Sequence, residues 1–166
     1  CVPRSHPSFN HFHNKEAVLA KAAEKAHVIT VTTEALYKTY RTYNKNTHII
    51  PNAYDDCMFG EMPHHTGRRR KILVWRGSNT HDEDLISVAD DIVAVANSPE
   101  FSDWKILFLG YNPAYITCRI KPDRVLYKEP LDIIDYFKFM ACLNAAIMMV
   151  PLVDTEFNRA KSNIAY

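Results

Sequence analysis

The chain has 166 residues, of which 47% are hydrophobic and 23% charged, and its formal net charge is +1. This length and composition are ordinary for a globular protein that buries a core. The near-neutral charge argues against a nucleic-acid partner, because the basic run Arg68-Arg69-Arg70-Lys71 is short and apolar residues follow it at once. No apolar stretch approaches the roughly 20 residues of a transmembrane helix, and residues 1–20 lack the apolar core of a signal peptide.

The cysteines and histidines predict no metal site. The four cysteines are scattered with no paired spacing, namely Cys1, Cys57, Cys118 and Cys142. Neither a disulfide framework nor a zinc ribbon follows from such a pattern, which fits a cytoplasmic protein. Two close histidine pairs also lack cysteine or carboxylate partners at ligand spacing, and we interpret them as surface or linker residues: His11 with His13, and His64 with His65.

The first third of the chain predicts an irregular lead-in followed by alternating helices and strands. The expected elements are a loop at 1–14, a helix at 15–26, a strand at 27–31, a second helix and a strand at 47–50. Thr32 or Thr33 is the expected N-cap of the second helix, because a threonine oxygen accepts hydrogen bonds from the amides of a first turn. Pro51 stops the second strand.

Residues 53–70 are polar and irregular and are the best candidate for a linker. Beyond them, apolar strands alternate with amphipathic helices. The expected elements are strands at 71–75, 105–109, 124–127 and 146–150, helices at 82–97 and 131–144, and a helix beginning near Asn158. We expect the first helix to bury Leu85, Val88, Ile92 and Val95, and the second Ile134, Phe137 and Ala141. The pattern predicts an α/β fold with a doubly wound parallel sheet.

Ligands of open parallel sheets bind beyond the carboxyl ends of the strands. Three segments follow strands in this chain, at 76–81, 110–112 and 154–162. The first has Gly77, where backbone can approach a ligand, with hydroxyl and amide donors behind it, and the last places a lysine and a serine at a helix start. A single glycine after a strand is more often a plain turn, and a lysine and serine at a helix start are more often a solvated charge and a cap. Neither a dinucleotide fingerprint nor a Walker A loop is present.

Four stretches, in order, resemble the glycosyltransferases of the GT-B fold, family 4 in particular. Residues 27–37 (HVITVTTEALY) resemble the last strand and helix of the N-terminal domain, written VTVST-x-x-L. Residues 49–53 (IIPNA) resemble the IPN-G/A junction between the two domains. Residues 71–85 (KILVWRGSNTHDEDL) are similar to the W-x-GS-x-x-H-x-x-DL pattern that opens the C-terminal domain. Residues 151–162 (PLVDTEFNRAKS) resemble the P-L-x-D-x-x-F-N-x-x-K-S stretch of the donor site.

The resemblance implies a remnant of an acceptor-side domain at 1–52, a linker at 53–70, and a truncated Rossmann-like donor domain at 71–166. The residues it implies as contacts of a nucleotide sugar are Gly77 and Ser78 at the diphosphate, Asn158, Lys161 and Ser162 at the phosphates or the sugar, and Tyr127, Lys128 and Glu129 at the base. His81 stands near the diphosphate loop, where it either donates to an oxyanion or caps a helix.

The chain departs from the family pattern at its acidic residues. Many relatives carry an E-x7-E pair beside the donor, whereas here the resemblance implies Asp154 or Glu156 in place of the first acid, and the second is expected beyond Tyr166. Of the two cations that commonly face the diphosphate, Lys161 is the well-placed one, since Arg76 precedes the glycine instead of following it.

The resulting hypothesis is a glycosyltransferase that moves a sugar from a nucleotide-diphosphate donor to an unknown glycan, lipid or protein acceptor, with no metal or other cofactor. The chain alone is expected to bind donor weakly and to turn nothing over. One alternative is a nucleotide-sugar epimerase on the same scaffold, which would need acid/base residues that are not evident. The other is a non-catalytic α/β binding or assembly module; a receiver domain would need an acidic pair after its first strand, where Arg-Gly-Ser stands.

Overall fold

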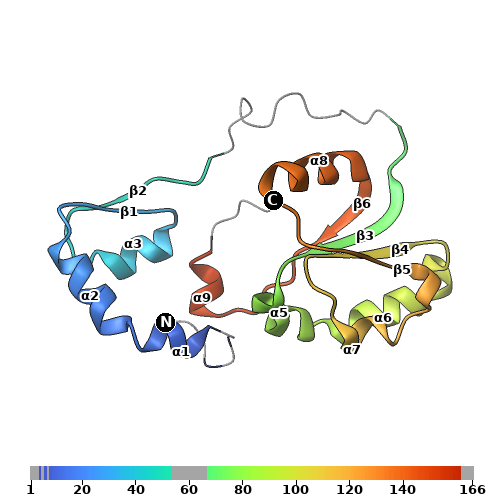
Figure 1. The fold of residues 1–166 in the computed structure, drawn as a ribbon, viewed down its shortest axis with the longest axis horizontal. Helices are drawn as coiled ribbons and strands as arrows, with labels where there is room; N and C mark the ends of the chain where they lie inside the picture. Colours follow the sequence, from blue (N-terminus) through green and yellow to red (C-terminus); the bar gives the residue numbers. More distant parts are fainter. Residues whose placement is uncertain (1–3, 5, 7, 54–66, 162–166) are drawn as a thin grey trace. The chain divides into compact units, whose positions relative to one another are not determined.

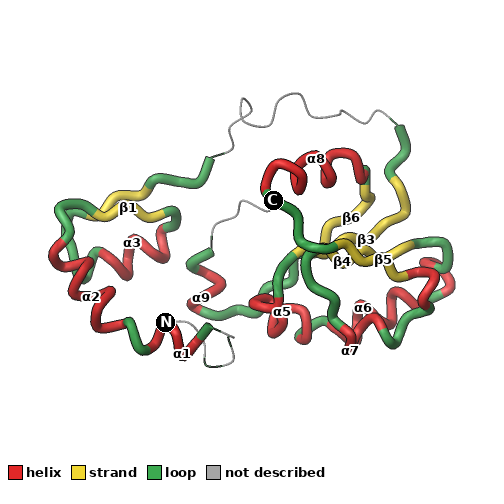
Figure 2. Tube along the Cα trace, in the orientation of Figure 1, coloured by secondary structure: helices red, strands yellow, loops and turns green. Residues whose placement is uncertain are grey.

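A computed structural model of the chain describes residues 4, 6, 8–53 and 67–161 (Figures 1 and 2). The chain forms two compact units, which we call the first unit (1–54 with 153–166) and the second unit (55–152). The predicted division into a domain remnant at 1–52, a linker at 53–70 and a donor domain at 71–166 stays a prediction. The compact units differ from it, because residues 153–166 group with residues 1–54. Several residues singled out in the sequence lie outside the described part: most of the linker at 54–66, and Cys1, Cys57, His64, His65 and Ser162.

The second unit contains a four-stranded sheet in which all neighbours are parallel (Figure 1). Its strands run in the order β5-β4-β3-β6 and comprise β3 (Arg70–Arg76), β4 (Lys105–Leu109), β5 (Val125–Lys128) and β6 (Ala145–Met149). Each matches an expected strand to within a residue or so, because each is a short apolar run bounded by polar residues. The predicted α/β fold with a parallel sheet is confirmed.

Side chains of β3 alternate between two separate cores, as a strand's period of two requires. Leu73 and Trp75 belong to the larger core, together with buried residues of the helices on that face. Ile72 and Val74 belong to the smaller core on the opposite face. The covering helices are α5 (Asp82–Ile86), α6 (Ala89–Asn97) and α7 (Ala114–Thr117) on the first face and α8 (Ile133–Leu143) on the second. The sheet is therefore doubly wound.

The helix expected at 82–97 is interrupted. It divides into α5 and α6, and the Ser87 hydroxyl at the break donates to the Asp84 carbonyl at 2.7 Å. Hydroxyls that bond backward to the backbone bend or break helices. One predicted core residue is wrong: Val95 is 39% exposed, because the buried stripe of α6 is Ala89, Ile92, Val93 and Ala96. The short helix α7 was not predicted.

Helix α8 packs through a different stripe from the one expected. Phe139, Met140 and Leu143 contact the smaller core, whereas the predicted residues Ile134, Phe137 and Ala141 are absent from it. Asp132 caps the helix, because its carboxylate accepts from two amides of the first turn at 3.0 Å each. At 11 residues α8 is the longest helix in the described part of the chain, and no helix there has both the length and the hydropathy of a membrane span.

A buried arginine joins the strand connections of the second unit. Arg124 is 7% exposed and donates through Nε to the Trp104 carbonyl at 3.0 Å. Its two terminal nitrogens donate to the carbonyls of Ala96 and Phe101. One guanidinium, which directly precedes β5, therefore satisfies three backbone acceptors between the end of α6 and the start of β4.

The first unit contains a two-stranded parallel sheet with short helices. Its elements are α1 (Phe9–His13), α2 (Glu16–Lys25), β1 (Ile29–Val31), α3 (Glu34–Tyr40), β2 (Thr47–Ile49) and α9 (Glu156–Arg159). The expectation of a loop throughout 1–14 is wrong, because Phe9 and His13 stack across one helical turn with centroids 5.1 Å apart. Thr33 is the cap of α3, as expected of one threonine of the pair, and accepts from the Leu36 amide at 3.3 Å.

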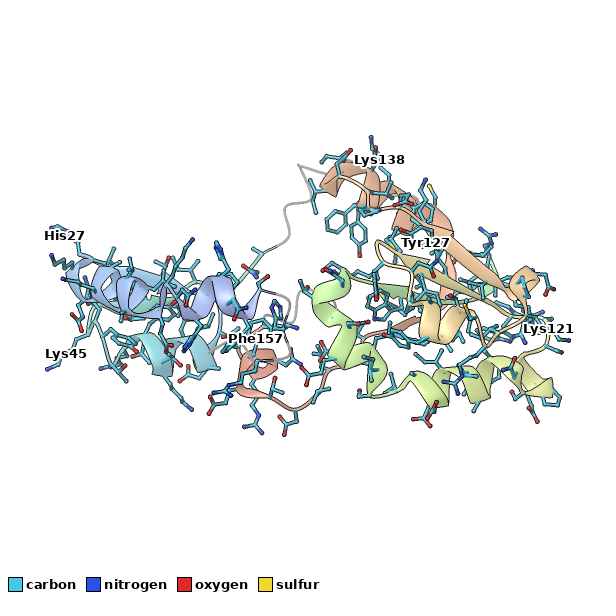
Figure 3. The ribbon with its side chains drawn as sticks, turned by 60° about the horizontal axis from the view of Figure 1, so that its bottom comes forward. His27, Lys45, Lys121, Tyr127, Lys138 and Phe157 are labelled. Atoms are coloured by element: carbon cyan, nitrogen blue, oxygen red, sulfur yellow. The ribbon has the colours of Figure 1, made fainter. Side chains whose placement is uncertain are left out.

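Two asparagines hold the ends of the first unit's connections together. The Asn44 amide donates to the carbonyls of Ala23 and Ala26, at 3.1 and 2.6 Å. The Asn46 amide donates to the His27 carbonyl at 2.6 Å. The connection after α2 and the one before β2 therefore lie side by side, and Figure 3 labels one residue of each, His27 and Lys45.

Candidate functional site

The order of the four strands reverses direction between β3 and β6. Moving along the chain, β4 and β5 are added on one side of β3, and β6 is added on the other. Ligands of open α/β sheets bind in the crevice that such a reversal opens beyond the carboxyl ends of the strands. The residues at this point are Arg76, which ends β3, and Gly77 and Ser78, which follow it. The structure thus places residues 76–81, the first of the three segments that follow strands, at this reversal of strand order, which we call the switch point of the sheet.

The carboxyl ends of three adjacent strands are joined by hydrogen bonds through glycines. The Gly77 amide donates to the Leu109 carbonyl at 3.0 Å, and the Gly110 amide donates to the Lys128 carbonyl at 2.9 Å. Because the Gly77 N–H is engaged in this bond, we do not count it as a donor for a ligand. The loops after β3, β4 and β5 start from one hydrogen-bonded row.

Packing explains why glycine occupies both positions. A Cβ at Gly77 would lie 2.8 Å from two ring carbons of Trp75, which is 2% exposed. Gly110 has a φ of +94°, and a Cβ there would lie 2.6 Å from the Gly77 carbonyl oxygen. Neighbours within the fold therefore already exclude a side chain at Gly77, so its presence does not by itself require the close approach of a ligand.

The loop after Gly77 contains a single 3₁₀ turn, Asn79–His81, which Ser78 precedes and His81 ends. The Ser78 hydroxyl accepts from the Thr80 amide at 3.3 Å and lies 2.7 Å from the Thr80 hydroxyl. Ser78 is thus the cap of the turn, and its side chain is exposed. The structure places the predicted residues Gly77, Ser78 and His81 in one loop.

A buried carboxylate that the sequence reading overlooked contacts His81. Asp84 Oδ2 lies 3.1 Å from His81 Nδ1, and Asp84 is 4% exposed. On the same helix, Asp82 accepts a 2.6 Å hydrogen bond from the Tyr115 hydroxyl of α7. Burial, and next the Asp82 bond, raise the pKa of Tyr115 well above its usual range. The sequence signal for Asp84 was its position three residues after a histidine, which is one helical turn.

Arg76, which the family pattern does not favour as a diphosphate contact, also lies at the switch point. Arg76 ends β3 on the same strand face as Val74, and its guanidinium lies over the Tyr136 ring of α8, 5.6 Å from the ring centroid. Such a contact holds an arginine without using up its hydrogen-bond donors. The alternation of side chains along β3 turns Arg76 toward α8. Although Arg76 precedes Gly77, it therefore still lies beside the crevice at the carboxyl end of β3.

The predicted base-contacting residues lie at the carboxyl end of β5, two strands away from β3: Tyr127 and Lys128 end the strand and Glu129 follows it. The Tyr127 hydroxyl donates to the Glu129 carboxylate at 3.0 Å, and both side chains are exposed, as is Lys128. Desolvation, and next the bond to Glu129, raise the pKa of Tyr127. Figure 3 labels Tyr127 among the side chains of the second unit.

The remaining predicted site residues belong to the first unit. Asp154 makes a paired hydrogen bond with the Arg159 guanidinium, at 2.6 and 2.7 Å, and this bond lowers the pKa of Asp154. The Asn158 side chain donates to the Val153 carbonyl at 2.9 Å. Lys161 Nζ lies 4.9 Å from the centroid of the Phe157 ring. These contacts stabilise the turn around α9, whereas Ser162 lies outside the described residues.

A groove of about 510 Å³ in the first unit includes Glu156 and Lys161 in its wall. Most of its other lining is aromatic or aliphatic, including Phe9, Phe12, Leu19, Leu36, Tyr40, Tyr43 and Phe157. A diphosphate carries charges that an apolar lining does not solvate. The groove therefore suits an apolar group better than the charged end of a nucleotide sugar.

Metal ligands and thiols are sparse in the described part of the chain. No group of three or more histidine, cysteine, aspartate or glutamate side chains there is arranged to hold a metal ion. Cys118 and Cys142 are exposed free thiols.

Comparison with protein-family models gives no match, and comparison with curated proteins gives none either.

Proposed function

We propose that the second unit binds the nucleotide-diphosphate part of a sugar donor and that the chain is the donor-binding part of a glycosyltransferase. The supporting observation is the loop at the switch point, where Arg76 ends β3 and Gly77, Ser78 and His81 follow it. The resemblance of residues 71–85 to the opening of a GT-B donor domain supports the same conclusion. The donor is a substrate, and the acceptor is a second partner of unspecified chemistry.

Each polar group of the loop has a role that suits a diphosphate. The Arg76 guanidinium has planar donors that match phosphate oxygens, and its contact with Tyr136 already limits its motion. The exposed Ser78 hydroxyl adds a neutral donor. A diphosphate that leaves the sugar gains negative charge, so cations held in place beforehand stabilise it more than mobile ones would.

The base of the nucleotide would lie toward β5. Tyr127 is 41% exposed there, and an exposed aromatic ring offers a stacking face of about 1–3 kcal/mol to a base. The neighbouring Lys128 and Glu129 supply groups of both signs that distinguish one base from another. In this proposal Tyr127 contributes to affinity for every nucleotide, whereas Glu129 contributes to selectivity.

The proposal is tested by titrating the full chain with UDP-glucose, ADP-glucose and GDP-mannose while following backbone amides by NMR. We expect the amides of Gly77, Ser78 and Tyr127 to shift with one common affinity. An Arg76→Ala variant should bind about tenfold to hundredfold more weakly, whereas Arg119→Ala, on an exposed ion pair with Asp90, should bind normally. Absence of any shift at millimolar ligand, or equal binding by both variants, overturns the proposal.

A further inference from the structure

The amino ends of the sheet strands bring together basic residues that are distant in the sequence. All neighbours in the sheet are parallel, so the starts of β5, β4, β3 and β6 lie along one edge. A run of four cations leads into β3, one lysine begins β4, and another stands shortly before β5. We call this surface the basic edge and define it by Arg68, Arg69, Arg70, Lys71, Lys105 and Lys121.

Side-chain contacts connect the start of β3 with the strands on both sides of it. The Arg69 guanidinium donates to the Ala145 carbonyl, at the start of β6, at 3.4 Å. Lys71 forms an ion pair with Asp103, which lies just before β4. The hydrogen bond from Lys71 lowers the pKa of Asp103, and the charge of Arg68 contributes to the same shift. The cations of this run therefore reach from β6 to β4.

Lys105 extends the basic edge to β5. Its ammonium donates to the Asp123 carbonyl, just before β5. Lys121, two residues before Asp123, is exposed, and Figure 3 labels it at this end of the second unit. Neighbouring strands lie about 4.8 Å apart, so four strands give the basic edge a length of about 14 Å.

Cations outnumber carboxylates in the described part of this edge. The segments that open the four strands contain seven lysines and arginines and three carboxylates, at 67–71, 99–105, 121–124 and 144–145. One of the seven, Arg124, is buried and bonded to backbone carbonyls, whereas the arginines at 68–70 and Lys121 are exposed. Positive charge is thus concentrated here although the net charge of the chain is only +1, and such a local excess attracts anionic partners.

A lipid bilayer suits the basic edge better than a nucleic acid does. The cations lie along an edge instead of converging on one pocket, and an anionic bilayer attracts lysines and arginines that are spread in this way. The aromatic residues described beside them, Phe101 and Trp104, pack against each other at 5.0 Å and against the larger core, unlike the exposed rings on which bases stack. The cations also come from strand starts and loops, whereas a duplex groove admits a helix or a β-ribbon.

We propose that the basic edge is a docking surface for an anionic lipid bilayer. Its guanidinium and ammonium groups meet the phosphates and carboxylates of the headgroups, and each exposed cation strengthens binding about fivefold. Because the carboxyl ends of the strands lie at the opposite end of the sheet, this surface and the proposed donor site involve different residues. Membrane docking therefore does not depend on nucleotide binding.

The test is co-sedimentation of the full chain with vesicles of phosphatidylcholine that contain phosphatidylserine or lack it. We expect the chain to bind the anionic vesicles about a hundredfold more tightly than the neutral ones. Raising the salt from about 0.1 M to about 1 M shortens the Debye length from about 10 Å to about 3 Å and should release the chain. Equal binding to both kinds of vesicle, or binding to neither, overturns the proposal.

A triple variant assigns the binding to this edge. Arg68→Gln, Arg69→Gln and Lys121→Gln together remove three exposed cations and leave the contacts of Lys71 and Lys105 in place. This edge variant should bind anionic vesicles about a hundredfold more weakly than the parent. Should it fail to fold, Lys121→Gln alone should weaken binding about fivefold, and unchanged binding in that variant overturns the assignment.

The matched control makes the same change in net charge on the first unit. Lys21→Gln, Lys25→Gln and Lys45→Gln together remove three exposed cations there. This control variant should bind anionic vesicles as the parent does. An equal loss in the edge variant and the control variant would show that overall charge decides binding, and it would exclude a specific role for the basic edge.

Nucleic acid is the competing partner, and the same variants distinguish it. Single-stranded and duplex DNA oligonucleotides are titrated at the same salt and followed by fluorescence anisotropy. Binding to DNA that is lost in the edge variant, without binding to anionic vesicles, overturns the assignment to lipid. The nucleotide-sugar titration is a separate measurement on other residues, so failure of donor binding leaves this inference standing, and failure of vesicle binding leaves the proposed function standing.

Discussion

Replacing Gly110 by alanine should destabilise the second unit strongly. Gly110 has a φ of +94°, and a left-handed backbone costs a residue with a Cβ about 1–2 kcal/mol. The new Cβ would lie 2.6 Å from the Gly77 carbonyl, so that carbonyl has to move. Its displacement disturbs the 3.0 Å bond from the Gly77 amide to Leu109, which is worth about 1 kcal/mol. The expected loss is about 2–3 kcal/mol in the free energy of unfolding.

Urea unfolding followed by tryptophan fluorescence measures this loss. Both tryptophans of the chain, Trp75 and Trp104, belong to the second unit, so their signal reports on that unit alone. Gly67→Ala is the matched control, because nothing lies within 4 Å of a Cβ there, and it should change stability by less than about 0.5 kcal/mol. A Gly110→Ala variant as stable as the control would refute the reasoning from backbone strain and close contact.

Three further outcomes are expected. Arg124→Ala leaves three backbone carbonyls without their donor and should cost about 3 kcal/mol or more by the same fluorescence assay; a loss below 1 kcal/mol would contradict this. In Arg159→Ala the pKa of Asp154, lowered mainly by the Arg159 hydrogen bond, should rise toward its ordinary value in an NMR carboxyl titration. Because the folded pKa is the lower one, the contribution of this exposed pair to stability is present above the ordinary carboxyl range and is lost as pH falls through the folded value; an unchanged titration would contradict the assignment. Thr33→Val removes both the cap of α3 and the 3.0 Å bond to the Ala160 carbonyl, so the Leu36 amide should exchange faster with solvent, and unchanged exchange would exclude a capping role.

The strands of the second unit were predictable because most of them are short, continuous runs of apolar residues. KILVW and KILFL cannot be amphipathic, so burial on both faces is the only arrangement that satisfies them. The break between α5 and α6 was not predictable, since it depends on the Ser87 hydroxyl bonding to the Asp84 carbonyl. The stripe of α8 was misplaced for a related reason: an almost wholly apolar helix does not specify which side faces the sheet.

The candidate site was predictable in position and less so in composition. A glycine after the first strand indicated the loop, yet the reason for Gly77 lies in the packing of the Trp75 ring against it, and the reason for Gly110 in its contact with the Gly77 carbonyl, neither of which the sequence shows. Asp84 was not predicted as a site residue, because its contact with His81 depends on the helical turn between them and on the burial of its carboxylate. Arg76 was undervalued because its orientation follows from strand alternation and a contact with Tyr136 on a distant helix. The residues around α9 group with the first unit through contacts between segments that are distant in sequence, and the local pattern of residues does not show such contacts.

The row of hydrogen bonds from Gly77 to Leu109 and from Gly110 to Lys128 has a thermodynamic consequence for recognition. The three loops of the proposed donor site share one anchored edge, so their starting points would already be ordered before a ligand arrives. Binding then has to immobilise side chains rather than backbone, and less conformational entropy is lost on association. In hydrogen exchange these two glycine amides should behave as sheet amides and exchange together, which makes the edge a preorganised base for the loops above it.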